Sequence, residues 1–366
     1  MVTFEVAHPK LFSRRLQVRD TLHQFSCPHR KVPSMAKTKR LVKSFYRLLF
    51  PIVLLVVVAV GAASVWLVYD TSRPRTAAYL VTPEKYGQLS ARGATVTDET
   101  WTTRDGAVAR GWLLRGSPDA PAVILLHRYG ADRSHVLDLG VKLNEATNFT
   151  VFMPDQRAHG TDPSVKNTSF GGCESDDLSS AIAFLHGLKT PQQMPLVGKE
   201  IGIYGVEMGA LAALSAASAD TSVKSLVLDS VPADSDGLLA SAISKRYPFA
   251  SGITSKFASL GTYAYYYSNG CYKRTSSCDL ARTMGDRDVM LLAGIDEAEF
   301  QEPTSKLGKC FLPSSTVSVK TDLSPSGFSI INASLDLAGA YDQRVIDHFR
   351  NTLGAAIPLQ VQVAAK

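Results

Sequence analysis

The apolar positions divide the chain into one long N-terminal apolar segment and a body of shorter apolar runs. Residues 48–69, LLFPIVLLVVVAVGAASVWLVY, form 22 residues without a formal charge. A helix of ~20 apolar residues can cross a hydrocarbon layer of ~30 Å. We therefore expect a transmembrane helix over residues 48–69. A cleaved signal peptide and a buried core helix are the alternatives, but the run exceeds the ~7–15 residues of a signal core.

In the body, continuous apolar runs alternate with segments of helical spacing. Two alternating runs joined at Asp105-Gly106 predict a β-hairpin. Short continuous apolar runs, in contrast, are typical of strands buried on both faces of a sheet. Such strands are expected at residues 122–127, 150–155, 201–206, 223–230 and 287–296, with a last strand at 328–334 and helices at 174–188 and 340–353. The alternation predicts an α/β fold with a doubly wound, mostly parallel sheet.

The pattern also predicts the organisation of the whole chain. Expected are a basic cytoplasmic arm (1–47), the transmembrane helix (48–69), a polar linker (70–94), the sheet domain (95–355) and a tail (356–366). The stretch that begins at Met35 resembles a complete N-terminus by itself. Residues 1–34 are therefore expected to be either a start-site extension or a disordered tail. Residues 232–286 interrupt the alternation and predict a cap over the carboxyl edge of the sheet. Its tyrosines either line a pocket or pack the insertion to the body: Tyr263, Tyr265, Tyr266, Tyr267 and Tyr272.

The formal charge of +6 is unevenly distributed along the chain. Residues 1–47 hold eleven lysines and arginines against two acids, whereas the remaining 319 residues hold 28 against 31. The mildly acidic body gives no indication of nucleic-acid binding. Because cationic residues flank the apolar segment mainly on its N-terminal side, the N-terminus is expected in the cytoplasm. The main domain is then extracytoplasmic, either periplasmic or extracellular.

Five cysteines are consistent with that placement. Cys27 lies in the arm, and four lie beyond the apolar segment: Cys173, Cys271, Cys278 and Cys310. An even number outside the cytoplasm permits two disulfides, and we expect Cys271 to pair with Cys278. Four free buried thiols are the alternative. No histidine accompanies them at metal-ligand spacing, so no metal or other cofactor is expected.

The segment from Lys199 to Ser218, KEIGIYGVEMGALAALSAAS, predicts a strand, a sharp turn and a helix. Gly205 and Gly209 bracket Glu207 at the turn. Glycines at these positions leave room for a strained turn that directs the side chain between them toward a substrate. An acid at a helix N-terminus is also favoured by the helix dipole alone. Glu207 is therefore either a site residue or an acid that only stabilises the helix.

Four segments in order make the chain resemble the α/β-hydrolase family, in particular its membrane-anchored bacterial esterase and serine aminopeptidase-like members. They are LLHRYGADRS (125–134), PDQRAHGTD (154–162), GVEMG (205–209) and AGID (293–296). The resemblance places His127, Arg128, Tyr129, Gly130 and Met208 at the oxyanion loop and its surroundings, and Asp155, Arg157, His159 and Gly160 in a second loop motif. That motif departs from the family at Ala158 and Asp162, where glycine and serine are usual.

The resemblance also implies a catalytic triad, and two of its three members are absent. Glu207 stands where the family has its serine nucleophile, and a carboxylate has no proton to give to a base. Asp296 matches the acid. The base should follow the acid by roughly 25–30 residues, but His348, the one histidine after Asp296, lies inside the predicted last helix. His127 and His159 occupy positions that usually organise loops. The triad is thus degenerate.

Two functions remain open from the sequence. The first is a membrane-anchored pseudo-hydrolase that binds a small-molecule or peptide ligand, or acts as an interaction domain; a structural envelope protein is not separable from it. The second is an active hydrolase of ester or amide bonds with a non-standard site around Glu207 and Asp296. Enzymes of this fold with a carboxylate at the elbow use aspartate and still need a histidine to hydrolyse the ester intermediate.

Overall fold

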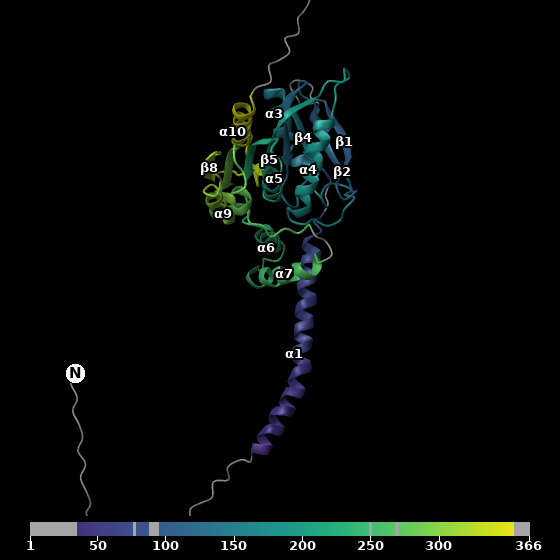
Figure 1. Ribbon diagram of the computed structural model, residues 1–366, viewed down its shortest axis with the longest axis vertical. Helices are drawn as coiled ribbons and strands as arrows, with labels where there is room; N and C mark the ends of the chain where they lie inside the picture. The colour runs from purple at the N-terminus through teal and green to yellow at the C-terminus, as the bar shows by residue number, and fades with distance from the viewer. Residues whose placement is uncertain (1–34, 76–77, 88–94, 249–250, 268–270, 355–366) are drawn as a thin grey trace, which may run out of the picture. The chain divides into compact units, whose positions relative to one another are not determined.

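The computed structural model describes residues 35–75, 78–87, 95–248, 251–267 and 271–354 (Figure 1). The predictions for residues 1–34 and 356–366 lie outside these residues. The chain forms two units, Met1–Leu55 and Val56–Lys366, and the second holds the sheet and the candidate site. Helix α1 (Met35–Thr71) extends beyond the predicted 48–69 at both ends. Its segment Val42–Thr71 is long and apolar enough to cross a membrane.

The second unit is built on one eight-stranded sheet with the order β1-β2-β4-β3-β5-β6-β7-β8 (Figure 1). β1 pairs antiparallel with β2 and β2 with β4, and all other neighbours are parallel. The strands are β1 (Val96–Thr102), β2 (Val108–Leu114), β3 (Ala120–Leu126), β4 (Thr150–Pro154), β5 (Val197–Val206), β6 (Val223–Asp229), β7 (Asp288–Gly294) and β8 (Thr316–Leu323). This confirms the predicted fold class.

Helices pack on both faces of the sheet, and strands β3 to β7 are therefore buried on both sides. One apolar core lies between the sheet and α4 (Gly172–Gly187) and α5 (Met208–Ala219). The other lies between the sheet and α3 (Leu137–Thr147) and α10 (Leu335–Leu353). The shorter helices are α2 (Pro83–Gly87), α8 (Ser277–Ala281), α9 (Gln301–Leu307), η1 (Arg133–Val136), η3 (Ile295–Phe300) and η4 (Ile330–Asn332).

The last strand was predicted in the wrong place. Residues 328–334 contain only the short helix η4, and the strand is β8, in a segment where no strand was predicted. β8 is the edge strand of the sheet, and most of its residues are exposed. An edge strand needs no continuous apolar run, so the sequence pattern did not reveal it.

The segment expected as a polar linker, 70–94, is partly packed on the domain. Tyr79 donates to Asp155 over 2.7 Å, and the Leu80 amide donates to the Ser134 hydroxyl. Tyr86 donates to Asp138 through its hydroxyl. The last turns of α1 pack on the same domain, since Ser64, Val68 and Thr71 are buried.

The insertion between β6 and β7 folds into α6 (Ser235–Arg246), α7 (Ser251–Tyr265) and α8. Tyr266 is buried, stacks on Tyr272 with ring centroids 4.6 Å apart, and donates to the Thr168 carbonyl. Tyr263 and Tyr267 are exposed. None of the five tyrosines lines either of the two cavities described below, so the buried ones pack the insertion to the body.

Candidate functional site

The turn between β5 and α5 has the geometry of a nucleophile elbow. Glu207 adopts φ 51° and ψ −104°, a left-handed conformation that costs ~1–3 kcal/mol in a residue other than glycine. Both positions require glycine because a side chain there would collide with neighbouring backbone. A Cβ at Gly205 would lie 2.5 Å from the backbone of Gly209, and a Cβ at Gly209 would lie 2.8 Å from the His127 carbonyl oxygen. The elbow therefore presents Glu207 at the carboxyl edge of the sheet.

The Glu207 carboxylate is held against the oxyanion loop. The backbone N–H of Tyr129 donates to its Oε2 over 3.0 Å, and Lys245 Nζ lies 4.0 Å from its Oε1. Lys245 is shared with Glu297 at 3.0 Å and Glu299 at 3.2 Å. Burial of Glu207 raises its pKa to about 7, although the Lys245 and Arg128 cations and the Tyr129 amide oppose the rise. At neutral pH the group is thus partly protonated.

His127 and His159 are engaged at both ring nitrogens. His127 Nε2 accepts from the Gln156 amide over 3.1 Å, and His159 Nε2 accepts from the Gly130 amide over 3.0 Å. Nδ1 of each ring faces a backbone carbonyl, which assigns the Nδ1–H tautomer to both. Burial lowers the pKa of His127 to about 3 and that of His159 to about 4. Both rings therefore hold loops in place as neutral groups.

Asp296 follows β7, where the resemblance places the acid, but its partners are serines. Its Oδ2 accepts from the Ser326 hydroxyl over 2.8 Å and from the Ser329 hydroxyl. Both serines belong to the loop that follows β8, the loop that carries the base in the family. The acid and the base loop are thus in contact, although the base itself is missing.

The loop after β8 places Phe328 against Lys245 and Arg128, the two cations near Glu207. The ring of Phe328 lies 3.9 Å from Lys245 Nζ and 4.4 Å from the Arg128 guanidinium. Phe328 is therefore close to the cation that faces Glu207 and adjacent to the serines that face Asp296. His348, by contrast, lies on α10 beside Asp288, the first residue of β7, at the opposite end of the strand.

A buried hydrogen-bond network around Asp229 supports this loop, and no sequence motif indicated it. Asp229, at the end of β6, accepts from the Tyr341 hydroxyl over 2.6 Å and from the Gly327 amide over 2.8 Å. Its carbonyl oxygen accepts from the Glu207 amide over 2.9 Å. Burial raises the pKa of Asp229. One residue therefore links the elbow to the base loop.

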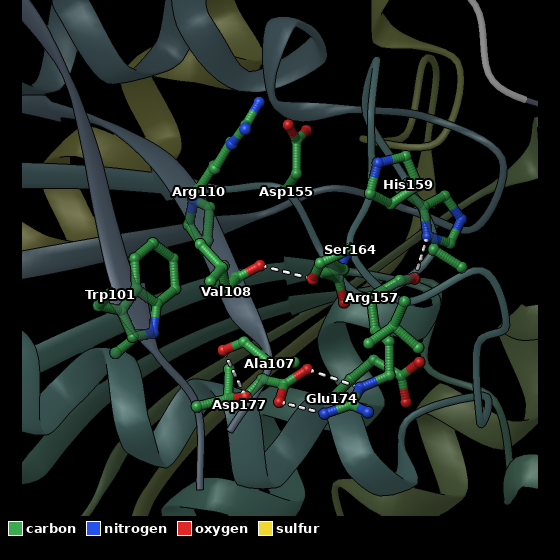
Figure 2. A pocket seen from close by; sticks show the side chains of 18 of the residues that line it. Trp101, Ala107, Val108, Arg110, Asp155, Arg157, His159, Ser164, Glu174 and Asp177 are labelled. Carbon is green, nitrogen blue, oxygen red and sulfur yellow. Dashed lines mark hydrogen bonds and ion pairs between the residues drawn. The ribbon is translucent and has the colours of Figure 1, made fainter. Parts of the chain in front are cut away.

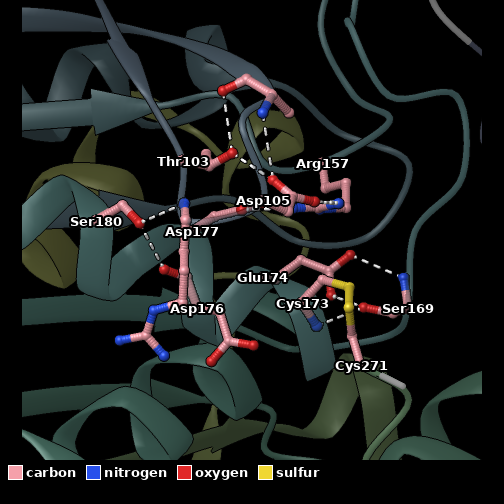
Figure 3. Close-up of polar contacts among 12 residues, drawn as sticks. Thr103, Asp105, Arg157, Ser169, Cys173, Glu174, Asp176, Asp177, Ser180 and Cys271 are labelled. Carbon is pink, nitrogen blue, oxygen red and sulfur yellow. Dashed lines mark hydrogen bonds and ion pairs between the residues drawn. A yellow bond between two sulfur atoms is a disulfide. The ribbon is translucent and has the colours of Figure 1, made fainter. Parts of the chain in front are cut away.

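Arg157 of the second loop motif braces the β1–β2 hairpin. Arg157 forms a bidentate pair with Asp177 at 2.6 and 2.9 Å and reaches Asp105 of the β1–β2 turn at 2.7 Å (Figure 3). Gly160 has φ +83°, and a Cβ there would collide with Asp155. These contacts are structural, so the motif is a feature of the fold.

Other positions named from the resemblance complete the oxyanion loop. Arg128 donates through Nε to the Phe328 carbonyl over 3.1 Å and through Nη1 to the Tyr129 carbonyl over 3.0 Å. Met208 begins α5, is buried, and its sulfur accepts from the Thr168 hydroxyl. The Tyr129 hydroxyl donates to the Thr71 carbonyl at the end of α1 over 2.6 Å. The oxyanion loop is therefore tied to that helix end.

A cavity of about 170 Å³ lies beside the loop that follows β4 (Figure 2). Trp101, Val108 and Leu178 form apolar walls, and Asp155 and His159 lie at its edge. A second cavity of about 100 Å³ lies between α3 and the loop after β8. Glu207 lines neither, so the elbow is identified as the site by its backbone geometry and not by a cavity.

The predicted pairing of Cys271 with Cys278 is wrong. The disulfides are Cys173–Cys271, which ties α4 to the insertion (Figure 3), and Cys278–Cys310, which ties α8 to the segment after α9. Each joins segments far apart in sequence, a proximity that spacing alone does not reveal. No cluster of three or more His, Cys, Asp or Glu side chains suited to a metal ion occurs among the described residues.

No protein-family model matches the sequence. It is 31% identical over 130 residues to the thiohydrolase apmlB of Arthrinium phaeospermum, covering 34% of this chain and 39% of that protein. It is 27% identical over 143 residues to the polyketide transferase grgF of a Penicillium species, covering 38% of this chain and 47% of that protein. The chain thus matches less than half the length of these two curated relatives.

Solved structures match over most of the domain. The esterase Pf2001 of Pyrococcus furiosus has a TM-score of 0.54 at 22% identity, with 77% of this chain and 98% of that chain covered. The α/β hydrolase GrgF of Penicillium has a TM-score of 0.51 at 16% identity, with 71% and 99% covered. At these identities the likeness concerns the fold alone. With the strand order and the elbow, it shows that this protein has the α/β-hydrolase fold.

Proposed function

We propose that this protein is a membrane-anchored, extracytoplasmic pseudo-hydrolase whose domain binds a ligand or partner and performs no acyl transfer. The observation that carries the proposal is the hydrogen bond from the Tyr129 amide to Glu207 Oε2. In an active enzyme of this fold, an amide of that loop stabilises the oxyanion. Here the Glu207 side chain accepts the hydrogen bond of the Tyr129 amide, in the place that a substrate oxyanion would take.

The surroundings of Glu207 support the same proposal. A working site needs a base within hydrogen-bond reach of the nucleophile or of an attacking water. The contacts described for the Glu207 carboxylate are to the Tyr129 amide and to Lys245, and the base loop packs Phe328 on Lys245. Lys245 is itself paired with Glu297 at 3.0 Å and Glu299 at 3.2 Å.

The test is turnover of short p-nitrophenyl esters and aminoacyl amides by the full-length protein in detergent. Wild type and Glu207→Ala are expected to be equally inactive, and a serine-directed fluorophosphonate should label neither. Glu207→Ser should stay nearly inactive because the base is missing. Glu207→Ser combined with Phe328→His should gain on the order of 10²-fold in rate over Glu207→Ser, the usual contribution of a general base. Wild-type turnover that Glu207→Ala abolishes would overturn the proposal.

The second candidate is a hydrolase that uses the Glu207 carboxylate. It is favoured by the pKa of about 7, which lets Glu207 exchange a proton near neutral pH. In that case Glu207→Gln, which keeps the shape and removes the titration, should abolish turnover, and the wild-type rate should change with an apparent pKa near that value. Asp296 is paired with Ser326 and Ser329, so Asp296→Asn tests whether it takes part.

A further inference from the structure

The last turns of α1 are built into the domain beside the insertion. Gly261 of α7 abuts the Ser64 carbonyl so closely that a Cβ there would collide with it. Val68 is fully buried in a cluster with residues of α5, α6 and α7. Asp70 pairs with Arg246 at the end of α6 over 2.6 Å. The crossing of α7 and α1 is therefore a fixed contact.

The position of this crossing along α1 sets the level of α7 relative to a bilayer. A hydrocarbon layer of ~30 Å takes up ~20 helical residues at a rise of ~1.5 Å each. Counted from Leu48, where the charge-free run begins, the layer ends near Leu67. Ser64 then lies about 5 Å inside that boundary. Because Gly261 touches Ser64, α7 lies at the level of the lipid interface.

α7 carries apolar and aromatic side chains on the face that the domain leaves uncovered. Ala258, Thr262 and Tyr266 are buried against the domain. Leu260, Tyr263 and Tyr267 are 59, 61 and 91% exposed. Leu260 and Tyr263 share one side of α7 by their spacing, with exposed Lys256 one turn before Leu260, and Tyr267 lies in the turn that follows α7. The face thus combines an apolar stripe with a cation, the composition of helices that lie in a membrane interface.

We propose that the α7 face, defined by Lys256, Leu260 and Tyr263 of α7 and by Tyr267 of the turn that follows it, docks on the bilayer surface and holds the elbow edge of the domain toward the membrane. The proposal rests on the membrane anchorage proposed above. We expect lipid to cover this face because the face lies next to the part of α1 that leaves the domain. Upstream of Val60, α1 leaves the domain, and Val56, Val57 and Val58 are each more than half exposed. A bilayer around those valines would meet α7 directly.

The docking also connects lipid to the oxyanion loop. The Tyr129 hydroxyl is bonded to the Thr71 carbonyl, and its amide is bonded to Glu207. The end of α1 and the elbow are therefore two contacts apart. A ligand of the elbow edge would approach from the membrane, which favours a lipid-like molecule over a polar metabolite.

The test places an environment-sensitive NBD fluorophore on single cysteines of the full chain in nanodiscs that contain doxyl-labelled phosphatidylcholine. The background is Cys27→Ser, since the other four cysteines are in disulfides. Leu260→Cys and Tyr267→Cys report the α7 face, and the nearly full exposure of Tyr267 makes that variant safe for folding. Val57→Cys reports the anchor. Met194→Cys, an exposed apolar position between α4 and β5, is the matched control.

Quenching at Leu260→Cys and Tyr267→Cys is expected to exceed that at Met194→Cys by about threefold or more, since only groups within the interface meet the acyl-chain quencher. Strong quenching at Val57→Cys with α7 no different from Met194→Cys would overturn the docking while leaving the anchor intact, and would assign the face to a protein partner. Absence of quenching at Val57→Cys would overturn the anchor and the docking together.

Discussion

At the scale of single residues, Glu207 places a charge where the elbow has little to neutralise it. The side chain is buried, and it receives one backbone hydrogen bond together with a cation 4.0 Å away that two other carboxylates share. Removing a carboxylate from water costs more than such partners return, so its pKa rises. The group is tolerated because it is largely neutral at the lower end of the physiological pH range.

This gives a pH dependence with a definite sign. The pKa of Glu207 rises from 4.5 to about 7 on folding, so the native state binds more protons than the unfolded state between those values. Stability therefore falls as pH rises through this window, by up to about 3 kcal/mol at ~1.4 kcal/mol per pKa unit. Glu207→Gln should remove that fall. The measurement is chemical unfolding of both proteins in detergent at pH 4.5, 6 and 8.

The difference between the two proteins isolates Glu207 from other titrating groups. His127 and His159 have lowered pKa values and destabilise the fold as pH falls, in both proteins alike. Glu207→Gln is expected to gain stability over wild type as pH rises. Parallel stability curves for the two proteins would contradict the buried carboxylate described here.

The sequence located the elbow but not what surrounds it. Gly205 and Gly209 predicted the turn, because local sterics require glycine there. Lys245 reaches Glu207 and Phe328 packs on Lys245, and both come from segments far along the chain that carry no motif. Such contacts are set by tertiary packing, so the missing base could be predicted from the absence of a histidine, whereas these contacts could not.

At the scale of elements, the sequence predicted those strands that are buried on both faces of the sheet. β3 and β7 are buried on both faces and appear as continuous apolar runs. β8 is mostly exposed, lies at the edge of the sheet, and was not predicted. The end of α1 was read as membrane helix throughout, because an apolar residue buried in protein and one facing lipid have the same hydropathy. Val68 is such a residue.

We expect Val68 to stabilise the domain through packing. Val68→Ala removes two buried methylene equivalents and should lower the free energy of unfolding by about 2 kcal/mol. Val58→Ala, the same change at an exposed position of the same helix, should alter it by less than about 0.5 kcal/mol. Thermal unfolding of both full-length variants in detergent measures the difference. Equal melting temperatures would mean that α1 is only a tether.

At the scale of the whole molecule, charge, cysteines and the apolar helix indicate one orientation. The first 47 residues carry the positive excess, and the rest of the chain is mildly acidic. For the proposed membrane anchor, the positive-inside rule predicts that residues 1–47 lie in the cytoplasm. Cys173–Cys271 and Cys278–Cys310 require an oxidising compartment to form and persist. The two lines of argument are independent, since one depends on the arm and the other on the domain.

Orientation can be tested without reference to activity. Alkaline phosphatase fused after Lys366 should be active and green fluorescent protein fused there should be dark, because the first needs export and the second fails to mature after export in an unfolded state. A fluorescent fusion would contradict the orientation and, with it, the reason for the disulfides. A membrane-impermeant maleimide applied to intact cells adds a chemical readout: Cys278→Ser frees Cys310, which should then be labelled, whereas the wild-type domain should not. Labelling of Cys310 only after cell lysis would place the domain inside, and the acidic body would then share its compartment with the basic arm.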